Sequence, residues 1–203
     1  MSVAPTLGVY KLPTIDNEPM RNYEPNSKDR QELQKAVDEL LACKPFEIPV
    51  IIDGQEFRSG KLAKQVNPGD HAQAVCYYHE ADERMVNIAI EGALKAKKQW
   101  MNMPWSERAA ISMKAADLIA HKYRYQLLAA TMVGQGKNVW QAEIDAGAEI
   151  CDFLRFGVKY VDDMYQIQPP RNSPGVWNRT EYRPLEGFVL AISPFNFTAI
   201  AGN

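Results

Sequence analysis

The sequence predicts an α/β fold. Two hairpin-like patterns, several amphipathic helical stretches after them and one continuous apolar run near the C-terminus lead to this prediction. The apolar run, Phe188–Ile192, is typical of a strand buried on both faces of a parallel sheet. With 203 residues, of which 46% are hydrophobic and 24% charged, the chain is long enough for one globular domain.

Residues 1–45 are predicted to form an N-terminal arm and one short helix. Residues 1–28 contain Pro, Asn and isolated charges without a period, so they form either an arm over the domain or a disordered segment, and no core is expected there. Ser27 precedes a helical pattern that Lys44–Pro45 ends. Its apolar residues recur at intervals of three and four: Leu33, Ala36, Val37, Leu40 and Leu41.

Residues 46–203 are predicted to form the second unit, and it begins with strands. Ile48, Val50 and Ile52 alternate with other residues, Asp53-Gly54 is a strong two-residue turn, and Gln55–Phe57 resumes the extended pattern. A second extended pair turns at residues 67–70, and Ala74–Tyr78 is its return strand.

Helices are predicted to follow these strands. The first begins at Asp82 as N-cap and the second at Ser106, a third spans Tyr123–Val133, and a longer one spans residues 138–165. The inward positions expected in the first two are Met85, Ala89, Ala93, Ala96 and Trp100, then Ile111, Ala115, Leu118 and Ile119.

The C-terminal region is predicted to be extended. Prolines at 169, 170 and 174 break the last helix, and Val176–Tyr182 has the pattern of an exposed extended segment that leads to the strand Phe188–Ile192. A parallel partner for that strand requires a crossover of a dozen or more residues, which the sequence after Ile192 does not supply. We therefore expect the chain to be a fragment, truncated at its first core parallel strand.

Composition argues against several classes of function. The formal charge is −2 without a sustained Lys/Arg cluster, so neither a nucleic-acid surface nor a polybasic membrane anchor is expected. The 3 cysteines lie at wide spacings without CxxC, and the 3 histidines show no HxxxH or HExxH spacing. The sequence therefore predicts no disulfide framework and no metal site.

Three stretches are candidates for chemistry. "VGQGKN", residues 133–138, lacks the first glycine of a phosphate loop and the Ser or Thr after its lysine, so a helix cap followed by a loop is the better interpretation. Asp145, Glu149 and Asp152 lie at spacings of four and three. They form either a solvated acidic face or, because small and aromatic residues lie near Glu149 on an α-helical wheel, a face on which Glu149 points inward to a functional site.

"AISPFNFT" is the third stretch. A buried strand that ends in Ser-Pro-Phe-Asn places a loop at the carboxyl edge of a parallel sheet, where open α/β folds bind ligands. Asn196 in that loop either caps a helix or tolerates a left-handed turn, or it directs its side-chain amide to a developing oxyanion.

The order and the sequences of the motifs from about Phe46 onward resemble those of the first third of an aldehyde dehydrogenase. The segments that carry this resemblance are "VIIDGQEF", "VNPGD", "AVCYYHEAD", "IAIEGALKAKKQW", "PWSERAAISMKAADLI" and "EGFVLAISPFNF". It implies the N-terminal portion of a Rossmann-type NAD-binding domain. Within the family, "TMVGQGKNVWQAEIDAGAEICDFLRF" and "ISPFNFTAIAGN" are similar to members that oxidise L-glutamate γ-semialdehyde to L-glutamate in proline breakdown.

The resemblance also implies roles for residues. Family members use NAD and a Cys thiolate nucleophile. Asn196 matches the oxyanion-donor position, Ser193 and Phe195 match positions that line the NAD site, and Glu149 matches a carboxylate near the aldehyde channel. Residues 168–183 resemble the strands through which these enzymes form homo-oligomers.

The nucleophile and the general-base Glu of the family fall outside this sequence, and Cys151 is expected to be a buried free thiol in a helix. The family implies the mitochondrial matrix, although the first twenty residues show no transit pattern, which leaves the cytoplasm as an alternative. A short noncatalytic chain that binds full-length subunits, an α/β interaction module, and an aldehyde dehydrogenase for another substrate class also remain open.

Overall fold

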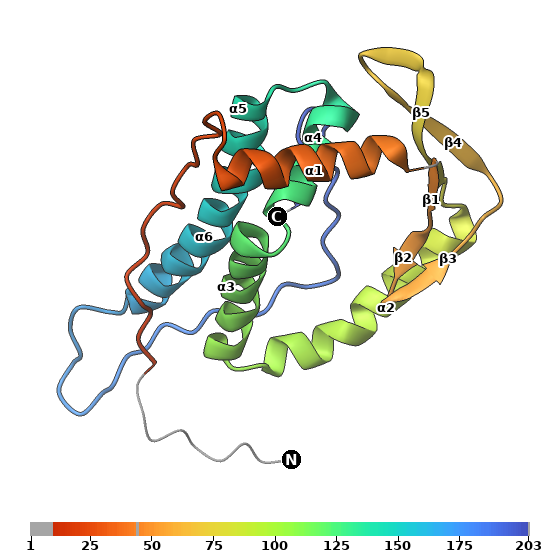
Figure 1. The fold of residues 1–203 in the computed structure, drawn as a ribbon. Helices are drawn as coiled ribbons and strands as arrows, with labels where there is room; N and C mark the ends of the chain where they lie inside the picture. The colour runs from red at the N-terminus through yellow and green to blue at the C-terminus, as the bar shows by residue number, and fades with distance from the viewer. Residues whose placement is uncertain (1–9, 44, 203) are drawn as a thin grey trace.

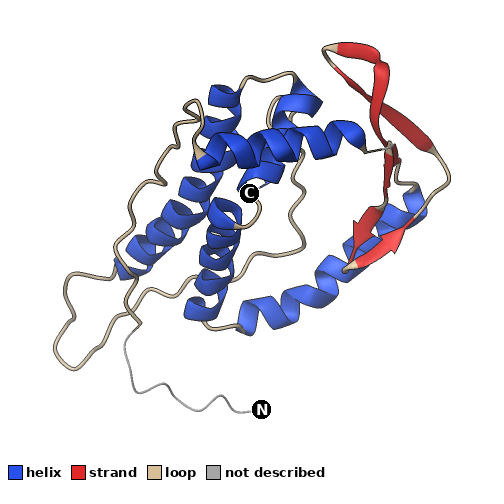
Figure 2. Ribbon diagram, viewed as in Figure 1, coloured by secondary structure: helices blue, strands red, loops and turns tan. Residues whose placement is uncertain are grey.

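The computed structural model describes residues 10–43 and 45–202. The helices are α1 (Lys28–Ala42), α2 (Glu83–Asn102), α3 (Trp105–His121), α4 (Arg124–Gln135), α5 (Val139–Ala142), a π-helix (Glu143–Glu149), α6 (Ile150–Gln166) and a 3-10 turn (Ile200–Gly202). The strands are β1 (Phe46–Ile48), β2 (Val50–Ile52), β3 (Gln55–Phe57), β4 (Leu62–Asn67) and β5 (Asp70–His79). Most of the helices lie together, and the strands lie to one side of them, where α2 reaches the β2–β3 hairpin (Figures 1 and 2). This mixed α/β arrangement confirms the predicted fold class.

Helix starts and turns lie close to where local chemistry predicts them. The Ser27 hydroxyl accepts from the backbone N–H of Arg30 at 3.2 Å, and the Asp82 carboxylate accepts from that of Met85 at 2.8 Å. The β2–β3 hairpin turns at Asp53 and Gly54, whose φ angles of 51° and 71° are those of a type I′ turn. The start of α3 differs: its N-cap is Pro104, two residues before Ser106.

The strand pairing differs in part from the sequence prediction. β4 and β5 form the expected antiparallel pair, but Ile48 does not belong to the β2–β3 hairpin. It ends β1, which pairs in parallel with β5 and gives the strand order β1-β5-β4. Local sequence patterns could not show this pairing, because Ile48 faces Tyr78, thirty residues away.

The segment Phe188–Ile192 forms no strand in the described structure, which corrects the prediction. Its backbone is irregular, and Val189, Leu190 and Ile192 are 75%, 75% and 83% exposed. A strand requires a hydrogen-bonded neighbour, and no described strand pairs with this segment.

Two clusters form the core of the helical part. One joins α1, α4, α5 and the π-helix through Leu33, Leu128, Ala142 and Ala146. The other joins α3 to α6 through Ala116, Ala120, Ile150 and Cys151. Along α3 the buried stripe is made of alanines, and Ile111, which we expected to face inward, is 52% exposed. Along α2 only Met85 of the five expected inward residues is buried.

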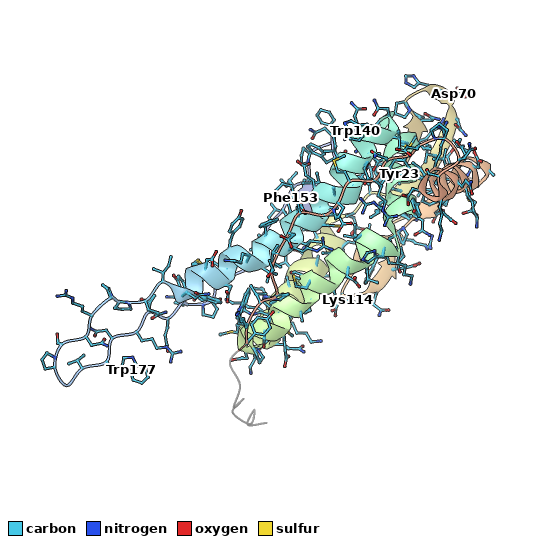
Figure 3. The ribbon with its side chains drawn as sticks, turned by 60° about the vertical axis from the view of Figure 1, so that its left-hand side comes forward. Tyr23, Asp70, Lys114, Trp140, Phe153 and Trp177 are labelled. Atoms are coloured by element: carbon cyan, nitrogen blue, oxygen red, sulfur yellow. The ribbon has the colours of Figure 1, made fainter. Side chains whose placement is uncertain are left out.

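The N-terminal arm, residues 10–25, lies along the helices, and α1 crosses α4 (Figure 1). In the described part this arm packs on the helices, whereas residues 1–9 lie outside that part. The arm nevertheless contributes to packing, because Tyr23 contacts the first cluster. At the far end of α6 the loop with Trp177 projects beyond the helices (Figure 3), and Trp177 is 85% exposed.

Candidate functional site

The loop Ser193–Thr198 docks on the C-terminal end of α4 through its backbone. The side chain of Gln135 donates to the carbonyl oxygen of Phe195 at 3.3 Å, and Nζ of Lys137 donates to the carbonyl oxygen of Asn196 at 2.6 Å. The carbonyl groups of two consecutive loop residues thus accept hydrogen bonds from side chains at, or just after, the end of α4.

A third contact anchors the end of this loop. The hydroxyl oxygens of Thr198 and Thr131 lie 2.7 Å apart, and Thr131 donates its own proton to the carbonyl of Leu127 at 2.8 Å. Thr198 is therefore the donor between the two hydroxyls. The next residues, Ala199 and Ile200, pack against the α3–α6 cluster, so the chain after the loop is also fixed.

Local structure explains where Lys137 lies. Gly136 ends α4 with φ 65°, the left-handed conformation that a glycine adopts at low cost. Asn138 then starts α5 with a capping box, in which its side chain and that of Gln141 bond each other's backbone N–H groups. The interpretation of "VGQGKN" as a cap and loop is confirmed, and the lysine between the two caps has a role that the sequence did not indicate.

Lys137 is surrounded by complementary groups. Its Nζ contacts the Asp145 carboxylate of the π-helix and lies 4.6 Å from the centroid of the Phe197 ring. The side chains of Lys137 and Asp145 are 19% and 4% exposed. A buried ion pair therefore lies directly beneath the loop.

The three loop residues expected at the site are exposed. Phe195 is 95% exposed, Ser193 is exposed, and the Asn196 side chain makes no hydrogen bond to any residue within 10–43 or 45–202. The backbone of Asn196 is anchored while its amide is free to donate. A fixed backbone with an available amide is the arrangement that an oxyanion donor requires.

Of the two orientations left open for Glu149, the structure shows the exposed one. By contrast, Asp145 is 3% exposed and Ile150 is 5% exposed. Five residues of the π-helix are buried, namely Glu143, Asp145, Ala146, Gly147 and Ala148, so its buried face is wider than the stripe that an α-helical wheel gives, and Glu149 lies outside it. The structure brings Asp145, not Glu149, to the loop that carries Asn196.

Sequence reasoning also missed a buried ionic cluster centred on Arg124. Its guanidinium donates to Glu18 at 2.7 Å and to both oxygens of Glu143, and the Arg124 and Glu143 side chains are 0% exposed. Glu18 also accepts from Arg155 at 2.7 Å, and Tyr23 donates to Glu143 at 2.5 Å. The cluster joins the arm to α4, the π-helix and α6.

These contacts shift acid–base equilibria. Burial opposes ionisation of Glu18, but hydrogen bonds from Arg155 and Arg124 outweigh it and hold the pKa of Glu18 below its ordinary value. Burial and the hydrogen bond to Glu143 raise the pKa of Tyr23 well above its ordinary value. At neutral pH Glu18 is therefore charged and Tyr23 is protonated.

The cysteines are free thiols in different surroundings. Cys43 is exposed, whereas Cys76 and Cys151 are buried. Burial raises the pKa of the Cys76 thiol and raises that of Cys151 to about 11, which disfavours a nucleophilic thiolate at either position. The prediction of a buried free thiol at Cys151 is confirmed.

Two further classes of site find no support in the described part of the chain. No group of three or more His, Cys, Asp or Glu side chains there is arranged to hold a metal ion. No described helix has the length and apolarity needed to cross a membrane.

Comparison with known proteins identifies relatives of the whole chain. A family model described as "Aldehyde dehydrogenase family" matches residues 55–202. A delta-1-pyrroline-5-carboxylate dehydrogenase of Agaricus bisporus is 59% identical over 197 residues, which cover 97% of this chain and 36% of that protein. The mitochondrial delta-1-pyrroline-5-carboxylate dehydrogenase of Homo sapiens is 46% identical over 189 residues, which cover 93% of this chain and 33% of that protein. The chain thus spans about a third of the length of these curated relatives.

A solved structure of a similarly named protein also matches this chain. The Delta-pyrroline-5-carboxylate dehydrogenase from Mycobacterium tuberculosis, in a crystal structure described as bound with NAD, matches with a TM-score of 0.93 and 41% identity. The match covers 98% of this chain and 37% of the bacterial one.

Proposed function

The chain belongs to the aldehyde dehydrogenase family, and we propose that it is part of an NAD-dependent dehydrogenase that oxidises L-glutamate γ-semialdehyde to L-glutamate in proline catabolism. The names of the Agaricus and human relatives support this substrate, and their identity to this chain extends over nearly all of it. Because the chain spans about a third of such proteins, the activity is proposed for a full-length dehydrogenase that carries this sequence.

The observation that carries the proposal is that the backbone of Asn196 is anchored while its side chain is exposed. Its carbonyl is held by Lys137 at 2.6 Å, its side chain is exposed, and its amide is not engaged by any described residue. When a nucleophile attacks an aldehyde, the carbonyl oxygen gains negative charge, and a preorganised N–H donor stabilises that charge without reorganising. We assign this donor role to the Asn196 amide.

Ser193 and Phe195 are proposed to contact NAD. Both lie on the exposed side of the anchored loop, and Phe195 is 95% exposed, so nothing in the described structure covers the face that a cofactor would need. NAD, when bound, supplies the acceptor for the hydride that leaves the aldehyde carbon. The role of this chain is to hold the loop against that cofactor.

The nucleophile is proposed to come from residues other than those described here. Cys76 and Cys151 are buried with raised thiol pKa values, and no cation among the described residues is in hydrogen-bond contact with either sulfur to stabilise a thiolate. The chain therefore contributes the oxyanion donor and cofactor contacts to a site whose attacking group lies elsewhere.

Glu149 is proposed as a substrate-binding carboxylate. It is exposed, so its carboxylate is accessible to the ammonium group of an amino-acid semialdehyde. Such an attraction acts equally on the ground state and the transition state. Glu149→Ala should therefore raise KM for glutamate semialdehyde and leave kcat nearly unchanged.

Two further properties are proposed from the relatives and the shape of the chain. The projecting residues 168–183, with Trp177 exposed, suit a contact between subunits of a homo-oligomer (Figure 3). The human and Dictyostelium discoideum relatives carry the word mitochondrial in their names, which supports a mitochondrial location.

The test is made in the full-length dehydrogenase. Asn196→Ala should lower kcat by on the order of a hundred- to a thousandfold, the usual loss for one oxyanion donor. Asn87→Ala, which removes an exposed asparagine of α2, is the matched control and should leave kcat unchanged. Near-normal turnover of Asn196→Ala, or a clear preference for simple alkanals over glutamate semialdehyde, would contradict the proposal.

A further inference from the structure

The ammonium group of Lys137 connects the loop that carries Asn196 to the π-helix that carries Asp145. It donates to the Asn196 carbonyl at 2.6 Å, contacts the Asp145 carboxylate and lies over the Phe197 ring. An ammonium group has three donors and no acceptor, so a carboxylate, a carbonyl and an aromatic face together use its bonding directions. Its position is therefore determined by tertiary contacts rather than by the flexible side chain.

The pairing with Asp145 explains why this lysine stays in place. One carboxylate oxygen of Asp145 contacts Lys137, and the other is buried without a hydrogen-bond partner among the described residues. A carboxylate removed from water must be compensated, and Lys137 is the cation that contacts it. If Lys137 left this position, its own charge would be solvated, but the Asp145 carboxylate would remain buried without a compensating cation.

The contact with Asn196 is placed where it orients the side chain. The carbonyl that Lys137 binds belongs to Asn196 itself, so the bond restrains the peptide plane next to the Cα from which the amide extends. Gln135 and Thr131 restrain the residues on either side, at Phe195 and Thr198. With the backbone fixed, the direction of the amide is limited to a few rotamers.

We propose that Lys137 is a positioning residue for Asn196 and that Asp145 holds the lysine in place; this proposal rests on the proposed role of Asn196 as oxyanion donor. Lys137 acts through the backbone and touches neither the aldehyde nor the cofactor. A misplacement of about 1 Å in a reacting group costs on the order of a hundredfold in rate. Losing the anchor should therefore slow turnover without abolishing substrate binding.

The test uses the full-length dehydrogenase and a variant that removes both charges. Lys137→Met/Asp145→Leu leaves no unpaired carboxylate in the interior, which is the main hazard of changing the lysine alone. We expect kcat to fall by on the order of ten- to a hundredfold with little change in KM for the aldehyde. Lys159→Met/Asp163→Leu removes the ion pair on α6 that does not contact the loop, and it should leave kcat unchanged.

A double-mutant cycle separates positioning from general structural support. In an Asn196→Ala background, Lys137→Met/Asp145→Leu should cause no further fall in kcat, because the group that it orients is already absent. An equal fall in both backgrounds, or no fall in either, overturns the positioning role while the loss in Asn196→Ala alone keeps the proposed function. If Asn196→Ala itself has normal turnover, both proposals fail.

A second variant keeps the test valid if the double variant does not fold. Lys137→Arg retains the positive charge opposite Asp145 but replaces the compact ammonium with a longer planar group, which shifts the contact with the Asn196 carbonyl. We expect a smaller fall in kcat, again confined to the background that contains Asn196. A fall that persists in Asn196→Ala overturns the proposal.

Discussion

Replacing Glu18 with Ala should release the N-terminal arm, residues 10–25, from the helices beneath it. The Glu18 carboxylate accepts hydrogen bonds from Arg124 and Arg155, each at 2.7 Å, and its side chain is 8% exposed. The variant removes both contacts and leaves the rest of the arm unchanged.

The expected magnitude follows from the charges that remain. Hydrogen bonds between charged partners contribute about 1.5–3 kcal/mol each, so two of them give about 3–6 kcal/mol. Arg124 keeps Glu143, and Arg155 is 18% exposed and gains water, so the lower end applies. A loss of about 3 kcal/mol makes local opening of the arm on the order of a hundredfold more frequent, since 1.4 kcal/mol is a factor of ten.

Hydrogen exchange followed by mass spectrometry measures this opening in peptides that cover residues 10–25. The readout is local, so it is valid in a full-length protein that does not unfold in two states. Glu24→Ala is the matched control, because Glu24 is an exposed glutamate on the same arm and makes no ion pair with a described residue. If Glu18→Ala accelerates exchange no more than Glu24→Ala, the buried ion pairs do not hold the arm and the reasoning is wrong.

Three further predictions concern the same region. Because the pKa of Glu18 in the folded chain lies below its ordinary value of 4.5, its contribution to stability is present above pH 4.5 and is lost as the pH falls through the lower folded value; arm protection, corrected for intrinsic exchange rates, should fall with acid in the wild type and should fall less in Glu18→Gln, in which only the other carboxylates that contact the arm still titrate. Gly147→Ala would place a Cβ 2.8 Å from Oε2 of Glu143, and should cost about 1–3 kcal/mol, seen as a lower melting temperature, whereas Gly157→Ala has no neighbour within 4 Å and serves as control. Cys43 should react quickly with a thiol reagent, and Cys151, buried with a pKa near 11, should react only on unfolding; equal rates would contradict the packing of α6 on α3.

The parts of the fold that the sequence predicted well depend on short-range chemistry. Ser27, Asp82 and Asn138 cap helices, and the Asp53-Gly54 turn closes a hairpin, because each acts within a few residues of itself. The parallel β1–β5 pair was missed because it joins residues far apart in the sequence, and a run of three residues from Phe46 carries no sign of its partner.

The candidate site shows the same contrast between features set by neighbouring residues and features set by residues far apart in the sequence. The loop at Asn196 could be recognised from its own residues, but the support beneath it could not, because Lys137 and Asp145 meet the loop only in three dimensions. An inward Glu149 was one of two interpretations left open, and it depended on a wheel with α-helical spacing throughout. The sequence has no simple marker of a π-helix, so Glu143–Glu149 was expected to be part of one continuous α-helix.

The π-helix at Glu143–Glu149 has a consequence for comparing chains of different length. A π turn holds one residue more than an α turn, so it absorbs a single inserted residue while the helices on either side keep their faces. A chain with one residue fewer here would wind as a continuous α-helix and still pack its later part on α3. An alignment forced through this segment without a gap would then place buried residues of one chain opposite exposed residues of the other, and would misjudge which acidic side chain corresponds to Asp145.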